Sequence, residues 1–126
     1  MIRVNEQSLT PIASDDQSSL LYEIVGRSAA IGYDHFSVAK TVLSRGAQVE
    51  RHYHRGSDEI YLFTRGTGQM QVNQENFAVG PGDLILIQPH DWHEVVAESA
   101  DDLEFYAITR PAFSPDDYLT ESDTTP

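Results

Sequence analysis

Three histidines and one glutamate stand at spacings that could place them around one metal ion: His52, His54, Glu59 and His93. Consecutive side chains of a β-strand point to opposite faces, so His52 and His54 share a face if their segment is extended. Neutral imidazole and carboxylate suit first-row divalent metals, and the chain has no cysteine for a closed thiolate zinc site. These residues therefore predict one divalent ion, and manganese, iron, nickel, cobalt and zinc are all compatible with them.

The predicted strands around these residues explain how they could meet. Residues 55–58 are typical of a turn between two strands, at 49–54 and 59–64, so Glu59 would fold back beside the histidine pair. His93 follows a separate apolar strand, 84–87, which the turn Gly80-Pro81-Gly82-Asp83 introduces. The ligands would thus come from three separate parts of the chain.

The same residues resemble the cupin superfamily, in particular its small single-domain members. The first cupin motif is matched at every spacing by Gly46, His52, His54, Glu59 and Gly66, and 82–93 keeps the spacing of the second. The resemblance implies a β-barrel in which His52, His54, Glu59 and His93 bind the metal. The chain departs from the usual pattern at Gln88-Pro89-His90, where the family has proline, any residue, glycine, and at Ala97, where it has asparagine.

Two other interpretations of the histidines stand beside the metal site. A histidine pair two residues apart in a strand is commonly a solvated edge or a hydrogen-bonded pair, although Glu59 and His93 in register favour a metal. A cupin barrel that keeps its ligands without any chemistry is the second alternative. His35 and His90 are expected to lie outside the site, His35 at a strand end and His90 in the turn before His93.

The strand pattern predicts an all-β fold, an antiparallel β-barrel or jelly roll in a single domain. Strands are expected at 20–25, 36–43, 49–54, 59–64, 69–72, 76–79, 84–87, 92–97 and 103–109. No segment of comparable length is typical of a helix. Short strands separated by glycine, proline and asparagine indicate a sandwich or barrel, which the cupin resemblance implies independently.

The predicted organisation has three parts. Residues 1–19 form an N-terminal arm that could hold a short strand at its start, and 20–110 form the barrel. Residues 111–126 form a C-terminal segment. In it Ser114-Pro115-Asp116-Asp117 has the pattern of a helix N-terminus, which predicts one helical turn ending at about Leu119. A disordered tail is expected from Glu121 to Pro126.

The composition limits the partners of the protein. Its 126 residues suit one domain, and the formal net charge of -12 would repel phosphate backbones and anionic lipids. We therefore expect neither nucleic acid nor a membrane as partner. The chain shows no signal-peptide pattern and no apolar run of membrane-spanning length, and the absence of cysteine suits a reducing compartment. The predicted location is the cytoplasm.

Strand parity also predicts the walls of a pocket. Tyr61 and Phe63 should share the face of Glu59, and Val95 should share that of His93. Gln69 and Gln71 share one face of their strand, where they could bind a ligand or be solvated. Such a wall suits a small organic molecule, although Tyr61 could equally be a core tyrosine.

Four protein ligands would leave two positions open on an octahedral ion. Open positions suit either Lewis-acid chemistry or oxygen activation. The cupin resemblance implies activities that include isomerases, lyases, decarboxylases and oxygenases, so we expect a metal-dependent enzyme of the isomerase or lyase type, acting on a small oxygen-rich substrate such as a sugar derivative or keto acid. A metal-dependent dioxygenase and a non-catalytic binding or sensing module are the alternatives. No catalytic residue beyond the metal site is assigned. Apolar residues on both faces of one strand, such as Ile60 and Leu62 opposite Tyr61 and Phe63, predict a homodimer.

Overall fold

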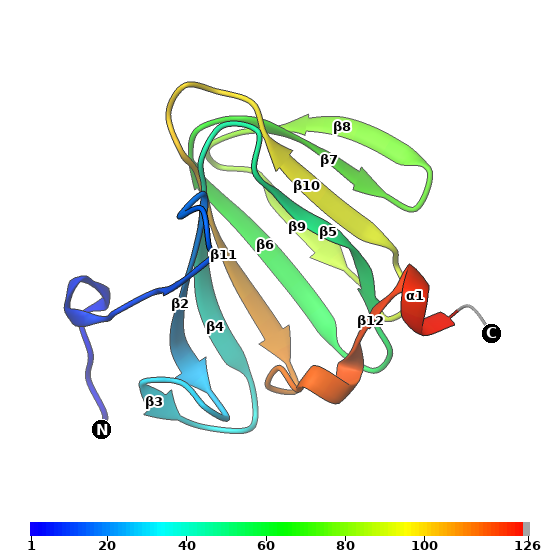
Figure 1. The fold of residues 1–126 in the computed structure, drawn as a ribbon. Coiled ribbons are helices and arrows are strands. Elements are labelled where there is room, and N and C mark those ends of the chain that lie inside the picture. The colour runs from blue at the N-terminus through cyan, green and yellow to red at the C-terminus, as the bar shows by residue number, and fades with distance from the viewer. Residues whose placement is uncertain (125–126) are drawn as a thin grey trace.

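Two antiparallel sheets that face each other hold most of the chain in the computed structural model, which describes residues 1–124 (Figure 1). The strands are β1 (Ile12–Ala13), β2 (Ser19–Gly26), β3 (Ile31–Gly32), β4 (Ser37–Leu43), β5 (Gln48–His54), β6 (Asp58–Arg65), β7 (Gly68–Val72), β8 (Glu75–Val79), β9 (Leu84–Ile87), β10 (His93–Ala97), β11 (Leu103–Arg110) and β12 (Tyr118–Thr120). The helical elements are short: η1 (Glu6–Ser8), η2 (Pro115–Asp117) and α1 (Glu121–Thr124). The predicted all-β jelly roll is confirmed.

The order of the strands brings distant parts of the sequence together. One sheet runs β1-β2-β4-β11-β6-β9, with β3 beside β2, and the other runs β12-β5-β10-β7-β8. All neighbours are antiparallel except β2 and β3. β6 pairs with β11 across the register Glu59↔Thr109, while β5 pairs with β10 across His52↔His93. The metal-ligand candidates therefore lie on both sheets.

The core lies between the sheets because apolar side chains alternate with polar ones along the strands. Its largest fully buried side chains include Phe63, Met70, Leu103 and Phe105, which are at most 1% exposed. Inward residues of β6 and β10 alternate with half-buried ones, as strand parity predicted. No helix within residues 1–124 has the length and apolar character to span a membrane.

A glycine is required at the turn after β6. Gly66 has φ +73°, a left-handed conformation that side chains with a Cβ rarely adopt. A Cβ at Gly66 would also collide with the carbonyl group of Asp102. The glycine in the first motif thus lets the β6–β7 turn pack directly against the chain that leads into β11.

The two ends of the chain differ from the sequence expectation. The short N-terminal strand lies at Ile12–Ala13, after η1, and not at the start of the arm. The predicted C-terminal turn corresponds to η2, but Tyr118–Thr120 then joins the second sheet beside β5. The predicted disorder from Glu121 is wrong as far as Thr124, which ends α1. Residues 125 and 126 lie outside the described residues.

Candidate metal centre

His52, His54, Glu59 and His93 converge inside the barrel. Each offers a ligand atom, and these atoms all lie within 4.8 Å of one another. The two histidines of β5 and His93 of β10 come from one sheet, and Glu59 of β6 comes from the other. All four side chains are buried, and His93 is 0% exposed. The structure thus brings together the four residues that the sequence singled out.

Backbone carbonyls fix the orientation of two of the imidazoles. Nδ1 of His52 lies 2.7 Å from the Glu50 carbonyl oxygen, and Nδ1 of His93 lies 2.8 Å from that of Asp91. Because a carbonyl oxygen only accepts, both Nδ1 atoms carry the proton and donate it. In a neutral ring with the proton on Nδ1, Nε2 presents a lone pair, which is the arrangement found in metal-ligating histidines.

The two oxygens of the Glu59 carboxylate have different neighbours. Oε2 accepts a hydrogen bond of 2.8 Å from the Thr109 hydroxyl on β11. Oε1 lies 3.3 Å from Nε2 of His54 and 3.3 Å from Nε2 of His93, without hydrogen-bond geometry to either. The hydrogen bond from Thr109 therefore fixes the Glu59 carboxylate, and its other oxygen faces the histidines.

Unpaired buried atoms show that the donor set fits a metal ion. Both ring nitrogens of His54, Oε1 of Glu59 and Nε2 of His93 are buried without a hydrogen-bond partner. Leaving buried polar atoms unpaired costs about 1–3 kcal/mol each, so such a cluster calls for a compensating partner. A divalent cation bound by three imidazoles and one carboxylate would pair with Oε1 of Glu59, Nε2 of His93 and one of the two ring nitrogens of His54.

Electrostatics keep most of this donor set ready to bind. Burial raises the pKa of Glu59, but contacts with His54 and His93 outweigh it and lower the pKa to about 2. Burial and the nearby His93 lower the pKa of His52 to about 3. Burial also lowers the pKa of His54, but the contact with Glu59 overrides it and leaves that pKa raised. Glu59 is thus ionised and His52 neutral at neutral pH.

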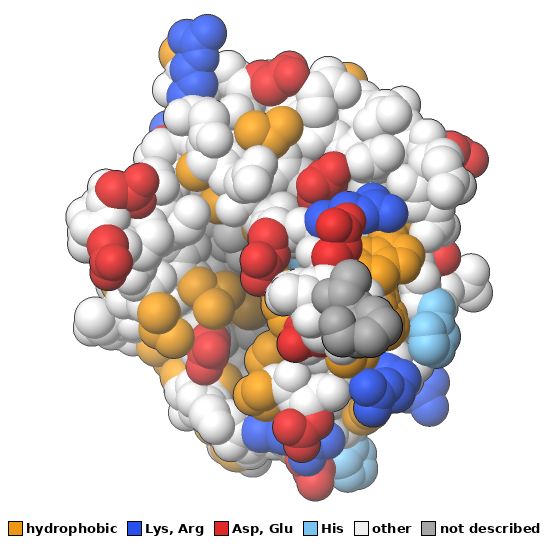
Figure 2. Space-filling model, turned by 45° about the vertical axis from the view of Figure 1, so that its right-hand side comes forward, with side chains coloured by type: hydrophobic (Ala, Val, Ile, Leu, Met, Phe, Trp, Pro, Cys, Tyr) orange, Lys and Arg blue, Asp and Glu red, His pale blue; other side chains and the backbone are white. Residues whose placement is uncertain are grey.

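A cavity of about 660 Å³ opens beside the cluster. His52, His54 and Glu59 form part of its wall, while the fully buried His93 does not line it. Figure 2 shows a hollow with hydrophobic side chains in its walls and acidic side chains around it. The volume is within the usual range of about 300–1,000 Å³ for small-molecule sites.

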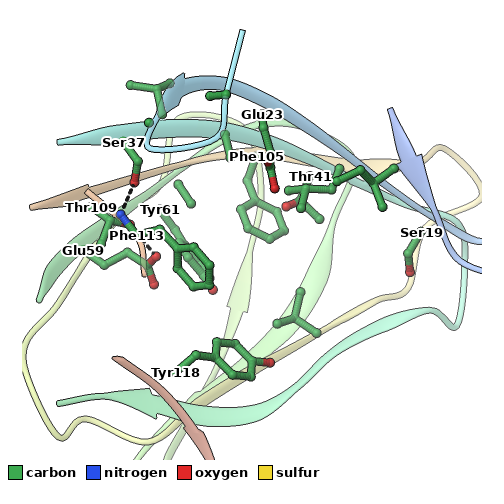
Figure 3. A pocket seen from close by; sticks show the side chains of 18 of the residues that line it. Ser19, Glu23, Ser37, Thr41, Glu59, Tyr61, Phe105, Thr109, Phe113 and Tyr118 are labelled. Carbon is green, nitrogen blue, oxygen red and sulfur yellow. Dashed lines mark hydrogen bonds between the residues drawn. The ribbon is translucent and has the colours of Figure 1, made fainter. Parts of the chain in front are cut away.

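The predicted pocket residues are divided between the cavity and other places. Tyr61 lines the cavity, as Figure 3 shows. Phe63 and Val95 share the inward face but belong to the packed core. Gln69 and Gln71 line a smaller pocket of about 170 Å³ on the other face of β7, because Met70 between them takes the core position. These four residues do not line the cavity next to the metal-ligand candidates.

The C-terminal segment supplies residues that sequence reasoning missed. Tyr118 of β12 stacks on His52, with ring centroids 4.3 Å apart and ring planes 19° apart, and lines the cavity. Its hydroxyl donates to the Glu50 carboxylate at 3.0 Å. Asp117 accepts hydrogen bonds from the Gly56 amide and the Ser57 hydroxyl, which ties η2 to the β5–β6 turn. No local sequence pattern predicted that Tyr118 lies on His52, because this contact depends on the pairing of β12 with β5.

The turn before His93 accommodates the departure from the family pattern. His90 stands where the family has glycine and has φ +70°, a conformation that costs a non-glycine residue about 1–2 kcal/mol. Its amide donates to the His54 carbonyl at 2.8 Å, and its ring stacks on Tyr53. His90 and His35 are not members of the metal-ligand cluster, and both are exposed.

Comparison with known proteins agrees with this geometry. Residues 40–109, more than half of the chain, match the cupin domain family, so the protein belongs to that family. It is 26% identical over 117 residues to the uncharacterized protein MJ1618 of Methanocaldococcus jannaschii, covering 93% of this chain and 92% of that protein.

Two solved structures are similar in fold. Pac13 of Streptomyces, a nucleoside dehydratase, has a TM-score of 0.75 at 17% identity, over 94% of this chain and 89% of that chain. A predicted oxalate decarboxylase of Thermotoga maritima has a TM-score of 0.77 at 22% identity, over 87% of this chain and 99% of that chain.

Proposed function

We propose that the protein is a metal-dependent enzyme of the isomerase or lyase type, acting on a small oxygen-rich molecule such as a sugar derivative or keto acid. The observation that carries the proposal is the buried His52, His54, Glu59 and His93 cluster, with unpaired donor atoms, at the wall of an open cavity. Dehydration and decarboxylation, the reactions in the names of the two structural neighbours, are both lyase chemistry.

The bound ion would supply Lewis-acid polarisation of a substrate oxygen. The three imidazoles and the Glu59 carboxylate hold the site, and Thr109 fixes the orientation of the carboxylate. The largely apolar cavity displaces water from a bound substrate and so strengthens polar contacts inside it.

Tyr61 is a candidate for orienting the substrate. Its side chain lines the cavity, and its hydroxyl makes no hydrogen bond with any residue in 1–124. Burial, and next the charge of Glu59, raise the pKa of Tyr61 well above its usual value. The phenol therefore keeps its proton and can donate a hydrogen bond to a substrate oxygen.

Metal content tests the site directly. We expect near-stoichiometric metal by plasma mass spectrometry in untagged protein purified without chelator, and its loss in His93→Ala. His35→Ala is the matched control, because His35 is exposed and does not belong to the metal-ligand cluster. A folded protein that takes up no metal even after reloading would refute the proposal.

Turnover tests the reaction class. Metal-loaded protein is incubated with a panel of hydroxy acids, keto acids, sugar acids and nucleosides, and products are followed by mass spectrometry. We expect loss of water or carbon dioxide, or an isomer, from at least one substrate, and no product with His93→Ala. Oxygen consumption by iron-loaded protein would instead favour a dioxygenase, and reversible binding without any product would favour a sensing module.

The homodimer and the cytoplasmic location belong to the same proposal. Leu84 and Leu86 are 64% and 60% exposed on β9, the edge strand beside Ile60 and Leu62 of β6. Such an apolar face suits a second copy of the chain. Sedimentation should show a dimer at micromolar concentration, and Leu86→Glu should give a monomer that still binds metal. A wild-type monomer would overturn this part.

A further inference from the structure

A second polar centre lies in the cavity, away from the metal-ligand cluster. Glu23 stands between Leu21 and Val25 on the inward face of β2, and all three line the cavity. Within residues 1–124 the Glu23 carboxylate has no hydrogen bond and no ion pair. Arg27, the cation that also lines the cavity, directs its Nε to the Ala112 carbonyl oxygen. The carboxylate is therefore available to a ligand.

Thr41 places a hydroxyl beside this carboxylate. The register of β2 and β4 pairs Glu23 with Ala39 and Leu21 with Thr41, so Glu23 and Thr41 are diagonal neighbours on one face. Figure 3 shows the two side chains extending into the cavity next to Phe105. The Thr41 hydroxyl also has no hydrogen bond to a residue of the described chain.

Glu23 and Glu59 lie well apart on the cavity wall. They belong to strands separated by β11 and β4, so three strand spacings of about 4.8 Å each separate them along the curved sheet. Between them the wall carries small or apolar side chains, among them Ala39 and Ala107. A ligand that reaches both centres must therefore be polar at its two ends.

We propose that Glu23, supported by Thr41, is a specificity-determining subsite that binds a hydrogen-bond-donating group, an ammonium or hydroxyl, at the end of the substrate remote from the metal. An ionised carboxylate only accepts hydrogen bonds, which selects a donor and rejects a second carboxylate or phosphate. The apolar surroundings strengthen this preference, because charge is screened less there than in water. The bifunctional substrate rests on the proposed metal site, whereas the Glu23 subsite does not.

The subsite can be tested without any metal. Binding of hexylammonium ion and of 1-hexanol to metal-free protein is followed by nuclear magnetic resonance titration. A hydrogen bond to a charged group is worth about 1.5–3 kcal/mol, so Glu23→Gln should weaken hexylammonium binding about tenfold or more. Thr41→Val should weaken it less. Glu75→Gln, at an exposed glutamate on β8, should bind it like the wild type.

A second arm tests the bifunctional substrate in manganese-loaded protein. 4-Aminobutanoate, 6-aminohexanoate and 8-aminooctanoate are compared with the alkanoates of the same length by calorimetry. We expect the amino compound to bind about tenfold tighter for at least one length, and Glu23→Gln to abolish the difference. Glu23→Gln should leave the metal content unchanged.

The outcomes separate this subsite from the metal site. The subsite is overturned if a folded Glu23→Gln variant binds hexylammonium as tightly as the wild type does. It is also overturned if the wild type binds hexylammonium no more tightly than hexanol. If no amino compound binds more tightly than the alkanoate of the same length, the role of Glu23 in binding a bifunctional substrate is refuted. Glu23-dependent hexylammonium binding in a protein that takes up no metal supports the subsite while refuting the proposed function.

Discussion

Thr109 should determine how firmly Glu59 is held. Its hydroxyl donates a buried hydrogen bond of 2.8 Å to Oε2 of Glu59, and both residues are at most 5% exposed. Thr109→Val keeps the shape of the side chain and removes only the donor. A hydrogen bond to a charged group contributes about 1.5–3 kcal/mol, so the free energy of unfolding of metal-free protein should fall by that amount.

The metal affinity of the same variant should fall as well. Groups that support a metal ligand typically change affinity about 10- to 100-fold, and Thr109 is the hydrogen-bond donor to Glu59 among residues 1–124. Urea unfolding gives the first quantity, and competition with a chromogenic chelator gives the second.

Two controls make this prediction specific. Thr109→Ser keeps the hydroxyl and should retain most of the metal affinity. Thr64→Val removes a hydroxyl that donates to the Glu104 carbonyl at an exposed position, so it should leave metal affinity unchanged. If Thr109→Val matches the wild type in both stability and affinity, Thr109 does not support the site and the reasoning is wrong.

Three further predictions concern the frame around the site. Gly66→Ala should lower the free energy of unfolding by about 2–5 kcal/mol, because the backbone is left-handed there and the new Cβ collides with Asp102. Gly46 has φ +85° but open space around it, so Gly46→Ala should lower that free energy by only about 1–2 kcal/mol in the same urea titration. Asp117→Ala should lower it by about 1–2 kcal/mol by freeing the β5–β6 turn, and the exposed neighbour Asp116→Ala should not; equal unfolding curves would contradict this. Burial and the hydrogen bond to Glu6 raise the pKa of Tyr106 to about 12, so the folded state favours the protonated phenol. This contribution to stability is complete below about pH 10 and is lost as the pH rises through 12. Absorbance at 295 nm should show the late ionisation, which Glu6→Gln shifts to lower pH.

The metal-ligand candidates could be found in the sequence because their signal is local. Strand parity placed His52 and His54 on one face, and Glu59 and Tyr61 on another, and the structure buries all four. Strand parity depends only on the alternation of side chains along an extended chain, so it can be applied without knowledge of the tertiary fold. The same rule could have revealed Glu23, an acid on a face that it shares with Leu21.

Other features depended on contacts between distant segments, which no local pattern encodes. Gln69 and Gln71 share a face as expected, but the sequence could not say which face β7 turns to the core, and Met70 takes that position. Tyr118 lies on His52 only because β12 pairs with β5. The sequence by itself determined the all-β fold and the identity of the clustered residues, since both follow from periodicity and spacing. Tertiary structure alone decided the shape of the cavity and the separation of its two polar centres, because these depend on how the strands are ordered and how the sheets curve.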